Sequence, residues 1–153
     1  AFSIAQESPD QPEIYPLIEA LDKTLDSQYE GFCNYRLDVS QLLVPQIRFF
    51  VARHAESKKV LGIGAVRFNE GYAEVKRMYS IPEARGIGVG EAILMNILEA
   101  IRGEGETIAR LETGDKLVAA VGLYKKHGFQ HIPAFGEYEA TADTSYCMEA
   151  RLQ

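Results

Sequence analysis

The segment EARGIGVGEAIL, from Glu83 to Leu94, is the most informative part of this sequence. It places glycine at alternate positions, Gly86, Gly88 and Gly90, just before a segment whose apolar residues recur with the period of an amphipathic helix. Glycine is costly to order where a helix begins, so these glycines need a local reason. Without side chains, they would let a bulky anion reach the free N–H groups at the positive end of the helix.

Arg85 strengthens the prediction of a loop that binds phosphate or pyrophosphate, because its planar donors suit phosphate oxygens. The alternative is a ligand-free turn whose glycines serve only its backbone angles. A P-loop would need Lys-Ser or Lys-Thr here, and a dinucleotide fingerprint would need Gly-x-Gly-x-x-Gly directly after a strand. A third pattern, Arg/Gln-x-x-Gly-x-Gly/Ala, is matched by Arg85, Gly88 and Gly90.

The order of the expected strands and helices along the sequence predicts a mixed sheet with helices. This is an α/β or α+β fold rather than a bundle or a sandwich. Antiparallel hairpins come first, and strands and helices then alternate. The expected helices cover residues 15–27, a short stretch near 39–43, 90–102 and 116–128. The expected strands cover residues 47–53, 60–68, 72–80 and 107–112, and closing strands lie within 129–135 and 144–152.

Composition limits the classes of function. The 153 residues suit a single domain, 1–153, and a net charge of −6 with a pI near 5.1 argues against nucleic acid as a partner. No apolar run is long enough for a membrane span, and the N-terminus lacks the pattern of a signal peptide. Two distant cysteines, Cys33 and Cys147, fit reduced thiols in a cytoplasmic protein better than a disulfide framework or a metal site.

Two segments resemble the motifs of one enzyme family. KRMYSIPEARGIGVGEAIL (76–94) resembles the acyl-CoA-binding motif of the GNAT superfamily of N-acetyltransferases. AAVGLYKKHGF (119–129) resembles the second motif of that superfamily, a helix that ends in Leu-Tyr-x-x-x-Gly-Phe. The order of strands and helices agrees from about residue 47 to 152, whereas the first 45 residues agree less. The chain is thus identified by resemblance as a small bacterial-type GNAT member.

The resemblance implies a twisted, mostly antiparallel mixed sheet with helices on both faces and a splay between the fourth and fifth strands, here 72–80 and 107–112. It implies acetyl-CoA as cosubstrate and no metal, and a homodimer is compatible with it. The pantetheine arm would pair with the backbone of Met78, Tyr79 and Ser80. The pyrophosphate would lie on Arg85, Gly86, Ile87, Gly88, Val89 and Gly90.

Two residues depart from a simple cofactor site. Glu91 follows the loop directly and would repel phosphate unless it points to solvent, although an acidic residue in a first helical turn is favourable. Leu117 stands where many members carry Asn or Gln against the cofactor, so that contact is expected to be lost or supplied elsewhere.

Tyr124 matches the superfamily tyrosine that often protonates the departing CoA thiolate, and a phenol can supply that proton. The alternative is a core residue, since Tyr124 shares a helical stripe with apolar side chains. Glu74 and Glu112 are candidates for the base that deprotonates an ammonium substrate. Either could instead pair with Lys76, Arg77 or Arg110 across strands, and water could relay the proton without a dedicated base.

The expected acceptor is a small primary amine. The segments 25–35 and 135–143 bring aromatic and acidic side chains together, and both kinds attract a small cation. The aromatic candidates are Tyr29, Phe32, Phe135 and Tyr138; ordinary solvated loops are the alternative. Two other classes of function stay open: an acyl-CoA sensor domain without turnover, and a plain nucleotide-binding domain, which the glycine spacing disfavours.

Overall fold

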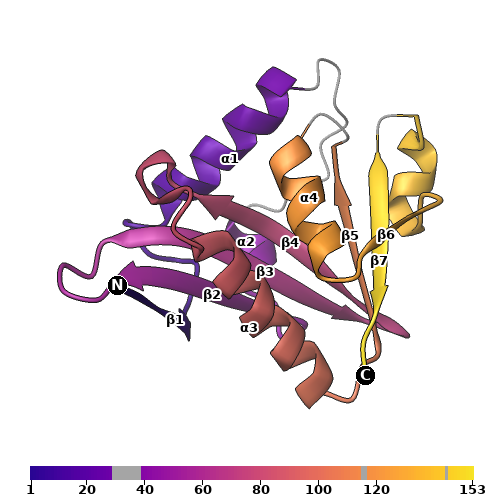
Figure 1. The fold of residues 1–153 in the computed structure, drawn as a ribbon, viewed down its shortest axis with the longest axis horizontal. Helices are drawn as coiled ribbons and strands as arrows, with labels where there is room; N and C mark the ends of the chain where they lie inside the picture. The colour runs from indigo at the N-terminus through magenta and orange to yellow at the C-terminus, as the bar shows by residue number, and fades with distance from the viewer. Residues whose placement is uncertain (29–38, 115–116, 144) are drawn as a thin grey trace.

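The computed structural model describes residues 1–28, 39–114, 117–143 and 145–153. Its sheet has the order β1-β2-β3-β4-β5-β7-β6 (Figure 1), with neighbours antiparallel except the parallel pair β4–β5. The strands are β1 (Phe2–Gln6), β2 (Ile47–His54), β3 (Val60–Asn69), β4 (Tyr72–Ser80), β5 (Ile108–Thr113), β6 (Gln130–Ile132) and β7 (Tyr146–Arg151). The predicted mixed, mostly antiparallel sheet is confirmed.

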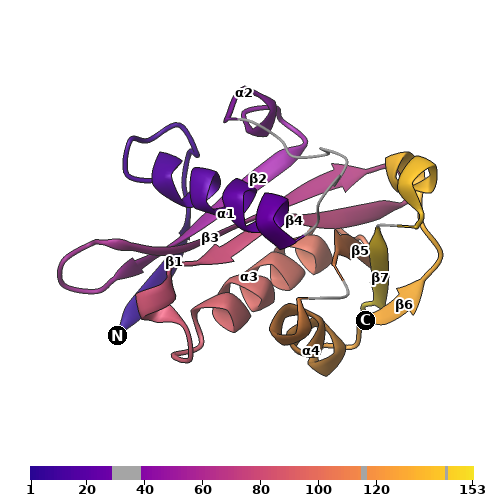
Figure 2. The ribbon, with the colours of Figure 1, turned by 90° about the horizontal axis from the view of Figure 1, so that it is seen from above.

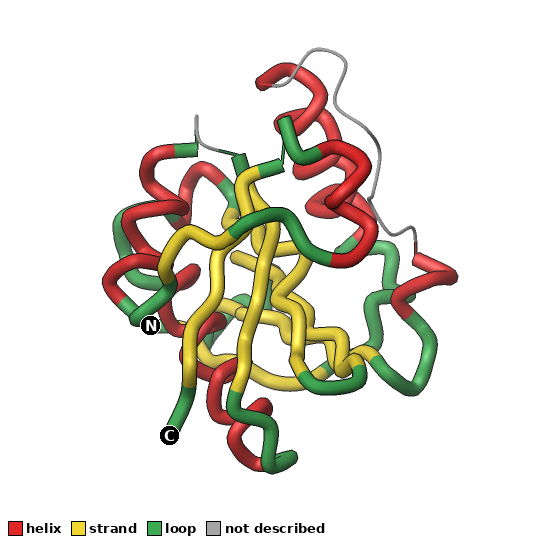
Figure 3. The backbone as a smooth tube through the Cα atoms, turned by 90° about the vertical axis from the view of Figure 1, so that its right-hand side faces the viewer, coloured by secondary structure: helices red, strands yellow, loops and turns green. Residues whose placement is uncertain are grey.

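Helices cover both faces of the sheet, as predicted. Figure 2 shows α1 and α2 on one side and α3 and α4 on the other, and in Figure 3 the strands run between them. The helices are α1 (Tyr15–Gln28), α2 (Val39–Leu42), α3 (Val89–Gly103) and α4 (Val118–Lys126), with 3-10 turns at Pro82–Ala84 and Gly136–Thr141.

Each face has its own apolar core. On the first, Leu17 and Ile18 of α1 pack against Ile63 and Ala65 of β3. On the second, the buried stripe of α3 predicted from its periodicity lies directly on the sheet. A Cβ at Gly64 would lie only 2.5 Å from Ile93 of α3, so α3 contacts the backbone of β3. The phosphate-loop candidate is therefore joined to a helix that is fixed on the sheet.

The fourth and fifth strands separate early. They pair only from Ala73 opposite Ala109 to Val75 opposite Leu111. On the other edge of β4, Lys76 pairs with Ala65 and Tyr79 with Ile63, so β4 has one residue more than β3 in this interval. This β-bulge lies where β4 leaves β5, and it provides the predicted splay.

The sequence did not predict one strand, and it predicted another that is shorter in the structure. β1 is an edge strand whose side chains are half-buried or exposed, so it lacks a strong apolar alternation. The strand expected within 129–135 has only three residues, Gln130–Ile132, and Pro133, which has no N–H for the ladder, follows it. The loop expected after it contains a 3-10 helix.

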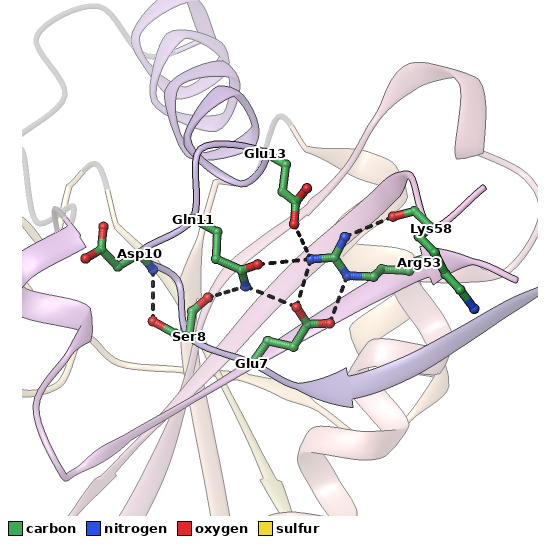
Figure 4. Close-up of polar contacts among 7 residues, drawn as sticks. All are labelled: Glu7, Ser8, Asp10, Gln11, Glu13, Arg53 and Lys58. Carbon is green, nitrogen blue, oxygen red and sulfur yellow. Dashed lines mark hydrogen bonds and ion pairs between the residues drawn. The ribbon is translucent and has the colours of Figure 1, made fainter. Parts of the chain in front are cut away.

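A polar cluster fixes the segment between β1 and α1. The Arg53 guanidinium donates to the carboxylate of Glu7 at 2.9 and 2.8 Å and to Glu13 at 2.6 Å (Figure 4). It also donates to Gln11 and to the carbonyl oxygen of Lys58. These contacts join the start of α1 to the β2–β3 hairpin.

Candidate active site

The glycine-rich loop joins the end of β4 to α3. Gly86 and Gly88 have φ angles of +85° and +87°, in the left-handed region that glycine adopts without strain. Gly88 is the residue before the helix begins. A Cβ on either glycine would meet nothing within 4 Å, so these two residues serve the backbone conformation that brings the helix N-terminus to the surface.

Gly90 differs from the other two, because it lies inside α3 without a left-handed φ. A Cβ there would lie 3.6 Å from the Ser80 hydroxyl and 3.9 Å from Leu123 of α4. Its missing side chain therefore opens the space between the end of β4, the start of α3 and α4. Leu117, before α4, makes no side-chain cap.

Arg85 holds a positive charge beside this loop. Its guanidinium donates to the Ser80 carbonyl oxygen at 3.3 and 3.2 Å and lies 5.6 Å from the centre of the Tyr79 ring. The side chain is exposed, as is Ile87, whereas Val89 is buried. A cation, two left-handed glycines and a helix N-terminus thus converge, and they suit a phosphate group.

Glu91 turns to α4 rather than to solvent. Its Oε2 oxygen lies 2.8 Å from the Lys126 ammonium and 2.7 Å from the His127 Nε2 atom. These partners lower the pKa of the Glu91 carboxyl. The negative charge next to the loop is therefore compensated, and the same contacts fasten the start of α3 to the end of α4.

The opposite face of the splay carries a cluster of buried polar side chains. The Oε2 oxygen of Glu74 accepts hydrogen bonds from the Lys76 ammonium at 3.0 Å and from the Tyr138 hydroxyl at 2.6 Å. The ammonium also donates to the Tyr138 hydroxyl at 3.1 Å. Burial and the Glu74 charge raise the pKa of Tyr138 far above its ordinary value. Glu74 is therefore engaged in an ion pair within its own strand.

Glu112, the second candidate base, differs from Glu74. It follows Leu111, the last residue of β5 that pairs with β4. Its Oε2 oxygen is buried and has no hydrogen-bond partner among the described residues. Burial raises the pKa of its carboxyl to about 7, against the opposing effect of a hydrogen bond to Ser145, and the Glu74 charge adds to the rise. Its carboxyl thus titrates near neutral pH at the point where the strands part.

Tyr124 lies on the other side of the sheet. It belongs to the core beneath α3 with Leu111 and Met148, and its ring meets that of Phe129 edge to face, 5.7 Å between centres. Burial raises the pKa of Tyr124 to about 12. Since neighbouring strand residues face opposite sides, Leu111 faces the side of Tyr124 and Glu112 faces away from it.

The aromatic candidates for the acceptor side are partly described. Phe135 and Tyr138 are buried with Cys147 and pack against Tyr72, so they support this face from within. Tyr29 and Phe32 lie outside the described residues. The sequence reading missed the position of Arg110, whose guanidinium lies over the rings of Tyr72 and Phe135, at 4.7 and 5.3 Å from their centres. Its partner is Glu149 at 2.8 Å, not either candidate base.

A family model described as the acetyltransferase (GNAT) domain matches residues 45–131, which include both motifs. The chain belongs to the GNAT family. It is therefore an acetyltransferase by family, and its resemblance to GNAT enzymes is confirmed.

Individual GNAT relatives support this. The chain is 41% identical over 138 residues to a protein named "IAA acetyltransferase" from Azospirillum brasilense. This match covers 89% of each of the two chains. A crystal structure from Klebsiella pneumoniae, assigned as an acyl-CoA N-acyltransferase, is 31% identical and superposes with a TM-score of 0.86 over 99% of this chain and 98% of the other. The PaiA N-acetyltransferase of Thermoplasma acidophilum, solved with coenzyme A, shares the fold at 18% identity with a TM-score of 0.74, covering 99% of each chain.

Membrane-spanning helices and metal-binding clusters are both absent from the described residues of this GNAT chain. No helix of the described residues has the length and apolar character that crossing a membrane requires. The same residues contain no group of three or more His, Cys, Asp or Glu side chains arranged to hold a metal ion. The absence of a metal and the cytoplasmic location stay predictions.

Proposed function

We propose that this GNAT acetyltransferase transfers the acetyl group of acetyl-CoA to the primary amine of a small molecule by direct attack. The observation that carries the proposal is the pair of groups on opposite sides of the β4–β5 splay. Glu112 has a buried carboxylate oxygen on one face with no partner among the described residues, and Tyr124 contributes a phenol from the other. A proton acceptor and a proton donor are the two groups that aminolysis of a thioester requires.

The cofactor end is built mainly from backbone. The loop Arg85 to Gly90 would hold the pyrophosphate through the helix N-terminus and the Arg85 guanidinium, and the left-handed glycines fit this role. The backbone of Met78, Tyr79 and Ser80 would accept the pantetheine arm where β4 no longer pairs with β5. That a GNAT protein of the same fold was solved with coenzyme A supports this assignment.

Glu112 is the better candidate for the base. Glu74 already accepts two hydrogen bonds, so its lone pairs and charge are engaged, whereas one oxygen of Glu112 is not. A carboxyl with a pKa of about 7 is half ionised at neutral pH and suits proton transfer there. Glu112 would take a proton from the ammonium, and the free amine would then attack the thioester carbonyl carbon.

Tyr124 would donate its proton to the sulfur as the C–N bond forms and the C–S bond breaks. The attacking nitrogen would lose its second proton to solvent, and solvent would also reprotonate the phenolate and remove the proton from Glu112, so that one proton is released per turnover. With its pKa at about 12, the phenol is a weaker acid than an ordinary tyrosine. Full transfer to a thiolate of pKa near 8.5 is uphill by about 5 kcal/mol, so the contribution of Tyr124 should be smaller than that of Glu112.

We propose a small amine rather than a protein tail as the acceptor, since Glu112 and the exposed Glu137 give this face carboxylates that attract an ammonium group. The test is a panel of free primary amines and lysine-rich peptides, with CoA release followed at low and high salt. We expect turnover of small amines that falls as salt rises. Turnover of the peptides alone would contradict the acceptor class. Tight acetyl-CoA binding with no acceptor turned over would instead favour a sensor domain.

A further inference from the structure

Arg77 is a buried guanidinium at the bulge of β4 that the proposed chemistry does not use. Glu74 and Arg77 are the two charged residues that are buried among the described residues, and only 4% of the Arg77 side chain is exposed. Arg77 falls between Lys76 and Met78, where the register between β3 and β4 shifts. It lies two residues after Val75, the last residue of β4 that pairs with β5.

The backbone of Arg77 is strained. Its φ angle is +56°, in the left-handed region where a side chain costs free energy that glycine would avoid. A glycine would form the same bulge more cheaply. The arginine side chain must therefore contribute something that outweighs this cost.

The side chain reaches across to α1. Its Nη2 atom donates to the Asp22 Oδ1 oxygen at 2.7 Å and to the Ile18 carbonyl oxygen at 3.3 Å. The Nε atom is buried without a hydrogen-bond partner among the described residues, so removing the guanidinium from water is only partly compensated. The bulge of β4 and one turn of α1 are thus held by the same group.

The direction of β4 changes at this residue. Tyr79 packs on the α1 face and the side chain of Met78 approaches Gly64 on the α3 face, while Lys76 and Arg77 both contact groups on the α1 face. Met78 to Ser80 follow Arg77 directly, so the backbone angle at Arg77 sets how these residues meet a ligand in the splay.

We propose that Arg77 is a positioning residue that couples the acetyl-CoA site on β4 to helix α1 through Asp22. The coupling rests on the proposed binding of acetyl-CoA along Met78 to Ser80. If occupancy of β4 stabilises the bulge, it also stabilises the contacts of Arg77 with α1, and by linkage the position of α1 affects acetyl-CoA affinity equally. Since α1 lies on the face of the candidate base, the coupling joins the cofactor side to the acceptor side.

The test uses acetyl-CoA as the probe, with affinity from calorimetry and backbone hydrogen exchange along α1. In the wild-type protein, we expect acetyl-CoA to slow exchange in α1 by about 5-fold or more. Arg77→Gly keeps the left-handed bulge but removes the link, so the slowing in α1 should disappear and acetyl-CoA should bind about 5-fold more weakly at most, the factor that reciprocal linkage gives. Asp22→Asn should reduce the slowing, since it removes the charge of the partner.

Arg77→Met separates strain from linkage, because it keeps a side chain at a left-handed position without the contacts that support it. We expect acetyl-CoA affinity to fall by about 10-fold and the slowing in α1 to disappear. The matched control is Arg53→Met, which removes another arginine that anchors the N-terminal side of α1 (Figure 4). It should lower thermal stability and leave both the affinity and the ligand-dependent slowing unchanged.

The outcomes distinguish the coupling from the proposed function. Folded Arg77→Gly and Asp22→Asn proteins that keep the full ligand-dependent slowing in α1 would overturn the coupling. So would a wild-type protein that binds acetyl-CoA with no change in α1. A wild-type protein that does not bind acetyl-CoA would overturn the proposed cofactor site itself.

Discussion

The two sides of the β4–β5 splay differ in their polar groups, which come from the backbone on one side and from side chains on the other. On the α3 side, the loop offers backbone N–H groups, and glycines at 86 and 88 set its shape. On the α1 side, the polar groups are side chains, and Tyr138 reaches Glu74 from a segment far along the chain. The proposed cofactor end therefore depends on a few consecutive residues. The acceptor end depends on how distant strands and loops come together.

The two sides also treat charge differently. Glu91 on the α3 side is compensated by two partners from α4, which leaves the loop suited to an anion. On the α1 side, Glu74 is compensated by Lys76, while one oxygen of Glu112 has no partner within the part of the chain that the structure describes. One carboxylate on that face is therefore ion-paired, and the other is the proposed base.

Substitution of Glu112, on the α1 side of the splay, should have the strongest effect on the reaction rate. Glu112→Gln removes the proposed base while it keeps the size of the side chain. We expect kcat/KM for the best amine to fall by about 10²- to 10⁴-fold, with the acetyl-CoA dissociation constant nearly unchanged. In the wild-type protein, kcat/KM should rise with pH through about 7, where the Glu112 carboxyl ionises. A Glu112→Gln enzyme with normal kcat/KM would assign the base elsewhere.

Substitution in the glycine-rich loop, on the α3 side of the splay, should instead change the binding of acetyl-CoA. Gly88→Val puts a branched side chain at a left-handed position of the loop and blocks the approach of a phosphate, so acetyl-CoA affinity should fall by about 100-fold in calorimetry. Gly105→Val is the matched control. Gly105 has a φ of +79° and open space around its Cβ position, yet it follows the far end of α3. Equal losses of affinity in both variants would mean that strain, not the loop, is responsible.

Tyr124→Phe tests the proposed proton donor, which lies in the core on the other side of the sheet. Because its phenol is a weak acid, we expect turnover to fall by only about 10- to 100-fold, with acetyl-CoA affinity retained. Presteady-state CoA release at saturating amine measures this directly. Unchanged turnover in a folded Tyr124→Phe protein would make Tyr124 a core residue only.

The smallest effect concerns stability. The folded-state pKa of Glu112, about 7, lies above the ordinary value near 4.3, so the folded protein binds this proton more tightly than the unfolded chain. Its favourable contribution is complete below about pH 4 and is lost as pH rises through 7, by up to about 4 kcal/mol. Urea unfolding at pH 5 and pH 8 should show this decline in the wild-type protein and a smaller one in Glu112→Gln. Equal declines would contradict the raised pKa.

Local patterns in the sequence predicted most of the fold. The apolar stripe of α3, the hairpin strands and the loop glycines all express short-range chemistry, and the structure has them within a residue or two. The left-handed bulge at Arg77 could not be predicted, because no glycine or turn residue marks it. The ion pair of Glu74 with Lys76 was one of the expected alternatives. The contacts of Tyr138 with Glu74 and of His127 with Glu91 were missed, since these partners come from distant parts of the chain.

The contact of α3 with the bare backbone of β3 has a consequence for protein engineering. A side chain at Gly62 would lie 2.7 Å from Val89, the first residue of α3, and one at Gly64 would collide with Ile93. Helix α3, which follows the loop, cannot shift without losing its close packing on β3, so the position of the loop is fixed. Libraries that seek new amine substrates should therefore leave Gly62 and Gly64 untouched and vary the 3-10 segment Gly136–Thr141, which packs against the opposite face through Tyr138.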